Sequence, residues 1–358
     1  MMQQNLLLQI LKTPTVMLGL DIKDWNRVLY EAHLLKLRGR LAHDAKKYDL
    51  WEQLPVKVRG ILVNAEITAE AGQRKIMWEV NRVRRALYGF TEKIILVKGG
   101  AYLAQGLKCA KGRTSVDIDI LVAKKNLDIV ENHLLLAGYA SQVMNDYDQQ
   151  YYREWAHELP PLVHPDRMVE VDVHHTILQV TNKLSPKINL MIDAAEQVED
   201  NIYVLCNEDM LLHSIVHQFV DGTLKASLRN LLEQKDMILE FNESPGFWSR
   251  FMDRAEELGL ARPVFYSLRY CKKMLDLEIP DDVMIRTKKS APGFMALKIM
   301  DMLISRAMVP YGEGRSVITG YLATNALYMR SHWLRMPPMM LAQHLTRKFF
   351  RRFTAQKS

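Results

Sequence analysis

Two aspartates inside an apolar run, VDIDILV (residues 116–122), constrain this chain more than any other feature. β-Branched residues dominate the run and a turn-forming stretch precedes it, so it predicts a β-strand. Because side chains at i and i+2 of a strand share a face, Asp117 and Asp119 leave the same side of the sheet. Like charges placed in this way repel each other and resist the loss of water. The simplest explanation is that a hard divalent cation binds between them and balances their charge.

A second strand supplies a candidate third carboxylate. The stretch MVEVDVHHTI (residues 168–177) alternates strictly, with Glu170, Asp172 and His174 on one face. If it pairs beside residues 116–122, a third acid stands opposite the aspartates. We favour Asp172 over Glu170 because it directly precedes the Val-His pair. Three carboxylates on neighbouring strands are what a two-metal site for phosphoryl or nucleotidyl transfer needs.

A candidate phosphate-binding turn lies upstream. Residues 93–97 (KIILV) predict a short buried strand that ends on Lys98-Gly99-Gly100, and a helix is predicted over 101–109. Backbone N–H groups at the start of a helix can bind phosphate oxygens. A glycine pair alone usually marks only a turn, so the aspartates downstream give this one its significance.

Helical patterns on both sides of these strands predict an α+β protein. We expect a small mixed-sheet core over residues 91–182, between an N-terminal helical region (1–90) and a C-terminal helical domain (183–310). Two separate periodic segments, 55–73 and 76–89, are predicted in the first region.

The positive charge is concentrated at the C-terminal end, in a basic tail predicted over residues 311–358. The chain has a net charge of +7, and from residue 314 onward it has no acid but eight bases (Arg315, Arg330, Arg335, Arg347, Lys348, Arg351, Arg352 and Lys357). The stretch 339–353 (MMLAQHLTRKFFRRF) has the spacing of an amphipathic helix. It could rest on an anionic membrane, bind nucleic acid or pack on the protein's own core.

Composition predicts a globular protein of a reducing compartment. The chain has 358 residues, of which 48% are hydrophobic and 25% are charged. Three widely separated cysteines (Cys109, Cys206 and Cys271) favour free thiols over a disulfide framework. No apolar run approaches the roughly 20 residues that span a bilayer. We expect a cytoplasmic protein, and the basic tail leaves a peripheral membrane location open.

Together the motifs resemble a known family. The order KGG, R-x-S-x-DIDILV and D-V-H is similar to nucleotidyltransferases of the DNA polymerase β type, and closest to a poorly characterised bacterial branch. The likeness covers about residues 20–240, with the motif within about 95–175. It implies a polymerase β-like core and a Mg²⁺-dependent enzyme, with Mn²⁺ as a substitute. Such an enzyme transfers a nucleoside monophosphate from an NTP to an acceptor hydroxyl and releases pyrophosphate.

The resemblance also implies roles for particular residues. Asp117, Asp119 and Asp172 would bind the metal and carry catalysis, and Asp172 would activate the acceptor hydroxyl. The nucleotide contacts would come from a second set (Lys98, Gly99, Gly100, Arg113 and Ser115). The acceptor, the base preference and a role for His174 are not implied. Whether Glu233 or Asp236 approaches the nucleotide is also open.

Three other interpretations stay open. The aspartates could be the acidic face of a solvent-exposed edge strand. The chain could be a non-catalytic protein that binds nucleotide, or docks on a membrane or partner, with the same fold. It could also be a toxin-like enzyme that modifies a protein or tRNA. His213 and His217, spaced i, i+4 on a helix, could form a metal pair, although we favour a structural role for them.

Overall fold

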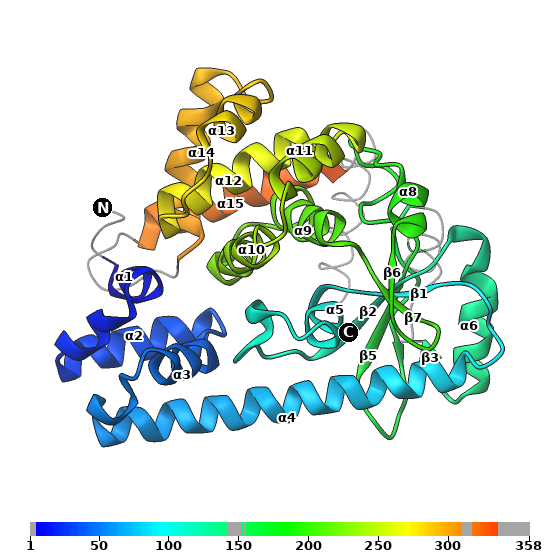
Figure 1. Ribbon diagram of the computed structural model, residues 1–358, viewed down its shortest axis with the longest axis horizontal. Helices are drawn as coiled ribbons and strands as arrows, with labels where there is room; N and C mark the ends of the chain where they lie inside the picture. Colours follow the sequence, from blue (N-terminus) through cyan, green and yellow to red (C-terminus); the bar gives the residue numbers. More distant parts are fainter. Residues whose placement is uncertain (1–4, 142–151, 153–154, 310–316, 336–358) are drawn as a thin grey trace, which may run out of the picture.

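The computed structural model describes residues 5–141, 152, 155–309 and 317–335. A seven-stranded mixed sheet is surrounded mainly by helices (Figure 1), which confirms the α+β prediction. The strand order is β3-β4-β5-β2-β1-β7-β6. The strands are β1 (Ile94–Val97), β2 (Asp117–Leu121), β3 (Ala140–Ser141), β4 (Leu162–Val163), β5 (Glu170–His174), β6 (Glu196–Glu199) and β7 (Ile202–Val204).

The three predicted strands form the centre of this sheet. β2 lies between β1, to which it is antiparallel, and β5, to which it is parallel. Ile118, Ile120 and Leu121 of β2 are buried, as expected for a strand covered on both faces.

The sequence patterns do not predict β6 and β7. β6 and β7 lie within 183–310, where only helices are expected, and β7 pairs in parallel with β1. β6 has the sequence EQVE and is exposed throughout, so it has none of the apolar alternation that identifies a strand. Pairing with the rest of the sheet, and not a local pattern, therefore makes this segment extended.

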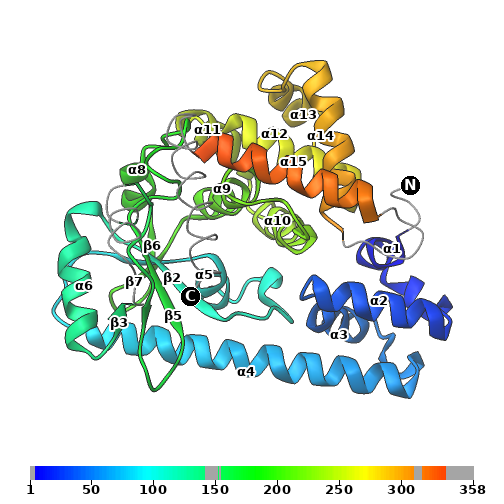
Figure 2. The ribbon, with the colours of Figure 1, turned by 180° about the vertical axis from the view of Figure 1, so that it is seen from behind.

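The N-terminal helices are α1 (Leu6–Lys12), α2 (Ile22–Leu34), α3 (Arg38–Lys47) and α4 (Val56–Ala86). The two segments predicted at 55–73 and 76–89 are one helix of 31 residues, α4, which runs along one side of the molecule (Figures 1 and 2). Gly72 and Gln73 interrupt the apolar pattern for a reason that only the fold reveals. A Cβ on Gly72 would lie 3.2 Å from Ser115 O, and Gln73 Nε2 donates to Ala110 O and Arg113 O at 2.8 Å.

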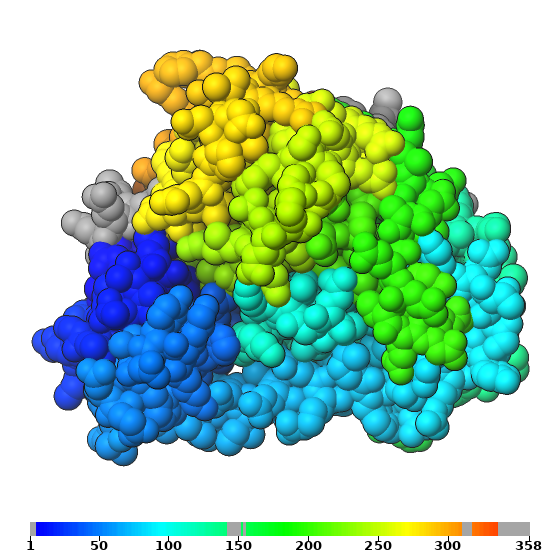
Figure 3. Space-filling model, viewed as in Figure 1, coloured from blue at the N-terminus to red at the C-terminus, as the bar shows by residue number. Residues whose placement is uncertain are grey.

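The remaining helices cover the sheet and build the C-terminal region. They are α5 (Lys98–Ala104), α6 (Leu127–Leu136), α8 (Ile188–Asp193), α9 (Asn207–Val216), α10 (Leu228–Phe241), α11 (Phe247–Glu257), α12 (Ala261–Leu275), α13 (Asp281–Lys288), α14 (Phe294–Ala307) and α15 (Val317–Arg335). In the space-filling view the N-terminal helices, coloured blue, lie against the later helices, coloured yellow and yellow-green (Figure 3).

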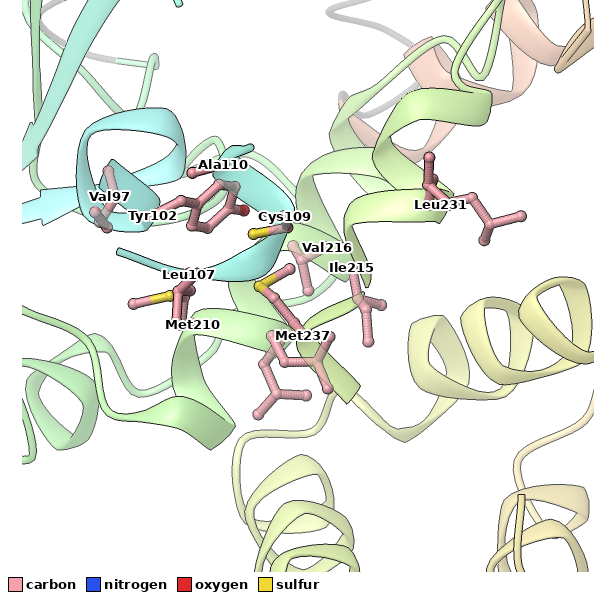
Figure 4. Close-up of a cluster of buried hydrophobic side chains, with 14 of the residues drawn as sticks. Val97, Tyr102, Leu107, Cys109, Ala110, Met210, Ile215, Val216, Leu231 and Met237 are labelled. Carbon is pink, nitrogen blue, oxygen red and sulfur yellow. The ribbon is translucent and has the colours of Figure 1, made fainter. Parts of the chain in front are cut away.

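A buried apolar cluster joins the sheet side of the molecule to the C-terminal helices. Tyr102 of α5 and Leu107 and Cys109 after it lie near Met210 of α9 and Met237 of α10 (Figure 4). Their burial stabilises the fold by about 25 cal/mol for each Å² of apolar surface removed from water. Helix α5 and the segment after it, which carry part of the motif, are therefore packed against the C-terminal helices.

Part of the basic tail is tied to the body of the protein. Arg330 of α15 donates to Phe219 O at 2.9 Å, and Arg335 lies 3.1 Å from Asp221 Oδ1. The amphipathic stretch 339–353 lies outside the described residues. No helix among the described residues is long and apolar enough to cross a membrane.

Glu79 of α4 binds Tyr139 and Arg167, which lie next to strands β3 and β5. These contacts give a first prediction. Tyr139 donates to Glu79 Oε1 at 2.6 Å and Arg167 donates to Glu79 Oε2 at 2.8 Å, and Glu79 is fully buried. Glu79→Ala should lower the free energy of unfolding by about 3–5 kcal/mol, because it leaves Arg167 without its anion. Urea denaturation measures this. The control, Glu70→Ala on the same helix, removes an exposed pair with Arg74 and should cost about 1 kcal/mol or less. Equal losses in the two variants would contradict the prediction.

Candidate functional site

Parallel pairing of β2 with β5 sets the geometry of the candidate site. Asp117 lies beside Glu170, and Asp119 lies beside Asp172. Registered side chains of neighbouring strands share a face. The conditional prediction that a third acid stands opposite the aspartate pair is therefore confirmed. The acid next to the buried Asp119 is Asp172.

Two groups hold Asp119 in its ionised form. Lys98 Nζ lies 2.6 Å and His174 Nε2 lies 2.9 Å from Asp119 Oδ1, and Asp119 is only 2% exposed. Burial by itself would raise the pKa of Asp119, but the Lys98 ammonium and the His174 hydrogen bond outweigh it and lower that pKa below its usual range. Asp119 in turn raises the pKa of the half-buried Lys98. Lys98, expected to contact the nucleotide, is thus paired with a candidate metal ligand.

A strained turn lets Lys98 reach Asp119. Lys98 has φ +50°, in the left-handed region that non-glycine residues avoid, at a cost of about 1–3 kcal/mol. It follows Val97, which pairs with Asp119 across the β1–β2 ladder. Helix α5 begins at Lys98, three residues before the predicted start at 101. Gly99 and Gly100 therefore lie in its first turn.

The carboxylate of Asp172 is less well satisfied by hydrogen bonds than that of Asp119. Its Oδ1 is buried and has no hydrogen-bond partner among the residues that the structure describes. Burial, and then the charges of Asp119 and Glu158, raise the pKa of Asp172 to about 8. An unsatisfied buried acceptor costs about 1–3 kcal/mol. A cation between Asp119 and Asp172 would remove this cost.

Arg113 explains why a glycine is needed at position 99. A Cβ there would collide with the Arg113 guanidinium and lie 3.1 Å from Ser115 Oγ. Arg113 is fixed, since it donates to Ser115 Oγ at 2.6 Å and to Glu233 Oε1 at 2.9 Å. The structure therefore brings Gly99, Arg113 and Ser115 together, and Glu233 of α10 joins them.

The sequence left open whether Glu233 or Asp236 approaches the nucleotide. Asp236 forms an ion pair with Arg40, and not with Arg113. Arg40 NH2 of α3 donates to Asp236 Oδ1 at 3.2 Å, and Arg40 also binds Asp44. Of the two acids, Glu233 is the one that contacts a predicted nucleotide-binding residue.

A cationic hollow borders this group. Its lining includes five bases and one acid (Lys36, Arg40, Lys111, Arg113, Arg229 and Glu233). Such a balance favours anions, and guanidinium groups bind phosphate oxygens well. Sequence reasoning missed Lys36, Arg40 and Arg229 because no motif connects them and two segments far apart in the chain supply them.

Histidines and a missed glutamate surround Asp119. His174, to which the sequence assigned no role, bonds Asp119 through Nε2, and its Nδ1 lies 3.2 Å from Glu158 Oε2. Glu158 and the neighbouring His157 carry no sequence signal, because only the fold brings them to β5. Burial lowers the pKa of His213 well below its usual value and that of His217 to about 4. Both are therefore neutral at pH 7.

The donor atoms fit a divalent cation. One ligand atom each from Asp119, Asp172 and His174 lie within 4.8 Å of one another. Carboxylate oxygens are the ligands that Mg²⁺ and Mn²⁺ prefer. The contacts from Lys98 and His174 both go to Oδ1 of Asp119.

Comparison with known proteins identifies the class of protein. A family model described as an uncharacterised nucleotidyltransferase matches residues 21–276. The chain therefore belongs to this nucleotidyltransferase family. No curated protein matches it. A solved structure, that of JHP933 from Helicobacter pylori, is similar at 12% sequence identity and a TM-score of 0.32, over 74% of this chain and 96% of that one. A similarity this weak carries no argument about function.

The crowding at Gly99 gives a second prediction. Gly99→Ala should cost about 1–3 kcal/mol of stability, because its Cβ must displace a guanidinium that is held by two partners. Gly100→Ala is the matched control, since its Cβ would meet only Leu96 Cδ2, at 3.9 Å. Alanine favours the helix, so this variant should be neutral or stabilised by up to about 1 kcal/mol. Thermal and urea unfolding of the pair test this, and equal stabilities would refute the explanation.

The raised pKa of Asp172 gives a third prediction. The native carboxyl holds its proton up to about pH 8, whereas the unfolded one releases it near pH 4. Between these values the folded state binds more protons, so its stability falls as the pH rises. The slope from this one group is at most about 1.4 kcal/mol per pH unit.

Asp172→Asn removes this proton. Without divalent cations, the stability of wild type relative to Asp172→Asn should therefore fall from pH 5 to pH 8.5. Urea denaturation at several pH values measures the difference, and parallel pH profiles would contradict the predicted protonation.

Proposed function

We propose that the chain is a Mg²⁺-dependent nucleotidyltransferase with a polymerase β-like core. The acceptor hydroxyl oxygen forms a bond to the α-phosphorus of an NTP, the bond from that phosphorus to the β-phosphate bridge breaks, and pyrophosphate leaves. The observation that supports this best is Asp172. Its buried, unpartnered carboxylate oxygen lies beside the ionised Asp119 on the neighbouring strand.

Each candidate residue has a distinct task in this proposal. Asp117, Asp119 and Asp172 would hold magnesium, which when bound would neutralise charge on the phosphate oxygens. Asp172 would take the proton of the acceptor hydroxyl on its carboxylate.

The basic side of the site would bind the triphosphate. The phosphates would lie against Gly99, Gly100 and the group around Arg113 and Ser115, and the cationic hollow would extend this surface. Lys98 would keep Asp119 ionised and add positive charge near the phosphates. Catalysis then rests on positioning and on electrostatic stabilisation.

Nucleotide binding tests the proposal without knowledge of the acceptor. Calorimetric titration of the purified chain with each NTP, with and without Mg²⁺, should reveal binding that requires the metal. The double variant Asp117→Asn, Asp119→Asn should lose this binding, because the metal loses two anionic ligands.

Glu170→Gln is the matched control. Glu170 shares a face with Asp172 but lies beside the partly exposed Asp117 and not beside Asp119. It should keep metal-dependent binding. Failure of every NTP to bind folded wild type, or equal loss in this control, would overturn the proposal.

A further inference from the structure

A second group of potential metal ligands adjoins the acidic site. Its members are His157, Glu158 and His174, whose ligand atoms lie within 4.8 Å of one another. Backbone hydrogen bonds fix the first two beside β5. His175 N donates to His157 O and Leu159 N donates to Val173 O, both at 2.9 Å. The three side chains therefore converge because the backbone holds them there.

The contact between His174 and Glu158 fits either a shared proton or a bound metal ion. A neutral imidazole has one N–H and one lone pair. Donation from Nε2 to Asp119 leaves the Nδ1 lone pair facing Glu158 Oε2 at 3.2 Å. Two lone pairs so close repel each other unless a proton or a metal ion lies between them.

The position of His157 distinguishes these two cases. His157 Nε2 lies 3.7 Å from the same oxygen, Glu158 Oε2, and the His157 and His174 rings stack with centroids 5.1 Å apart. A proton shared by His174 and Glu158 would not involve His157, whereas a metal ion could be bound by all three side chains. A tetrahedral ion with bonds of about 2.0–2.1 Å separates its ligands by about 3.4 Å. The two distances of 3.2 Å and 3.7 Å lie on either side of this value.

We propose that His157, Glu158 and His174 form a binding site for a transition-metal ion of the Zn²⁺ type, next to the carboxylates of Asp117, Asp119 and Asp172 that would hold magnesium. Two imidazoles and one carboxylate suit Zn²⁺ better than Mg²⁺. Three protein ligands leave a fourth position open. His174 would bind the ion through Nδ1 and donate from Nε2 to Asp119, an arrangement that orients metal-bound histidines in many proteins. The ion would thereby fix the position of Asp119.

Metal binding by the full chain tests this directly. Protein stripped with chelator is dialysed against Zn²⁺ or Co²⁺ with Mg²⁺ in excess, and bound metal is measured by elemental analysis. Wild type should bind one ion per chain, and Co²⁺ should give the visible spectrum of a tetrahedral site. His157→Ala and Glu158→Gln should each weaken binding by more than the roughly 10–100-fold that loss of an outer-shell partner costs.

Asp117→Asn is the control, because it removes a ligand of the acidic site and none of this one. It should keep the Zn²⁺ affinity of wild type. If a histidine variant fails to fold, X-ray absorption of the Co²⁺-loaded wild type still counts its nitrogen ligands, which should be two. Three outcomes would overturn the site: no stoichiometric Zn²⁺ or Co²⁺ in wild type, unchanged binding in His157→Ala, or loss of binding in Asp117→Asn. None of these outcomes depends on NTP binding, so the site can fail while the proposed function stands.

Discussion

The parallel register of β2 and β5 is the constraint on which the candidate site depends. It sets Asp119 beside Asp172, and it turns the alternating valines of β5 into the core, where Val171 and Val173 are buried. A shift of one residue would turn the acids into the apolar core and the valines out of it. Hydrophobic burial therefore fixes the register, and the register places the carboxylates.

The protein's own groups balance the charges around Asp119 only in part. Lys98 and His174 satisfy one carboxylate, yet Asp172 keeps an unpartnered oxygen and a raised pKa. Two features here are unfavourable for stability: the unpartnered buried oxygen of Asp172 and the left-handed backbone of Lys98. Natural proteins tend to have such features at functional sites and to recover the stability elsewhere.

The helical regions contribute charge as well as support. Glu233 of α10 holds Arg113 beside Gly99, and Asp236 of the same helix holds Arg40 of the N-terminal region. This helix of the C-terminal region is thus joined to the core by one ion pair and to the N-terminal region by another. The cationic hollow that results exists only when all three parts of the chain are assembled.

The sequence by itself determined the α+β class, the three central strands and the shared face of Asp117 and Asp119, because strand alternation and apolar runs are local properties. It also supported the nucleotidyltransferase resemblance, through motifs close together in the chain. Only the tertiary structure decided that α4 is continuous, that β6 and β7 join the sheet and that Lys98 pairs with Asp119. It alone brought His157 and Glu158 to His174 and Arg40 to Asp236. These contacts join residues far apart in sequence or in segments without periodicity, and their geometry follows from packing of the whole chain.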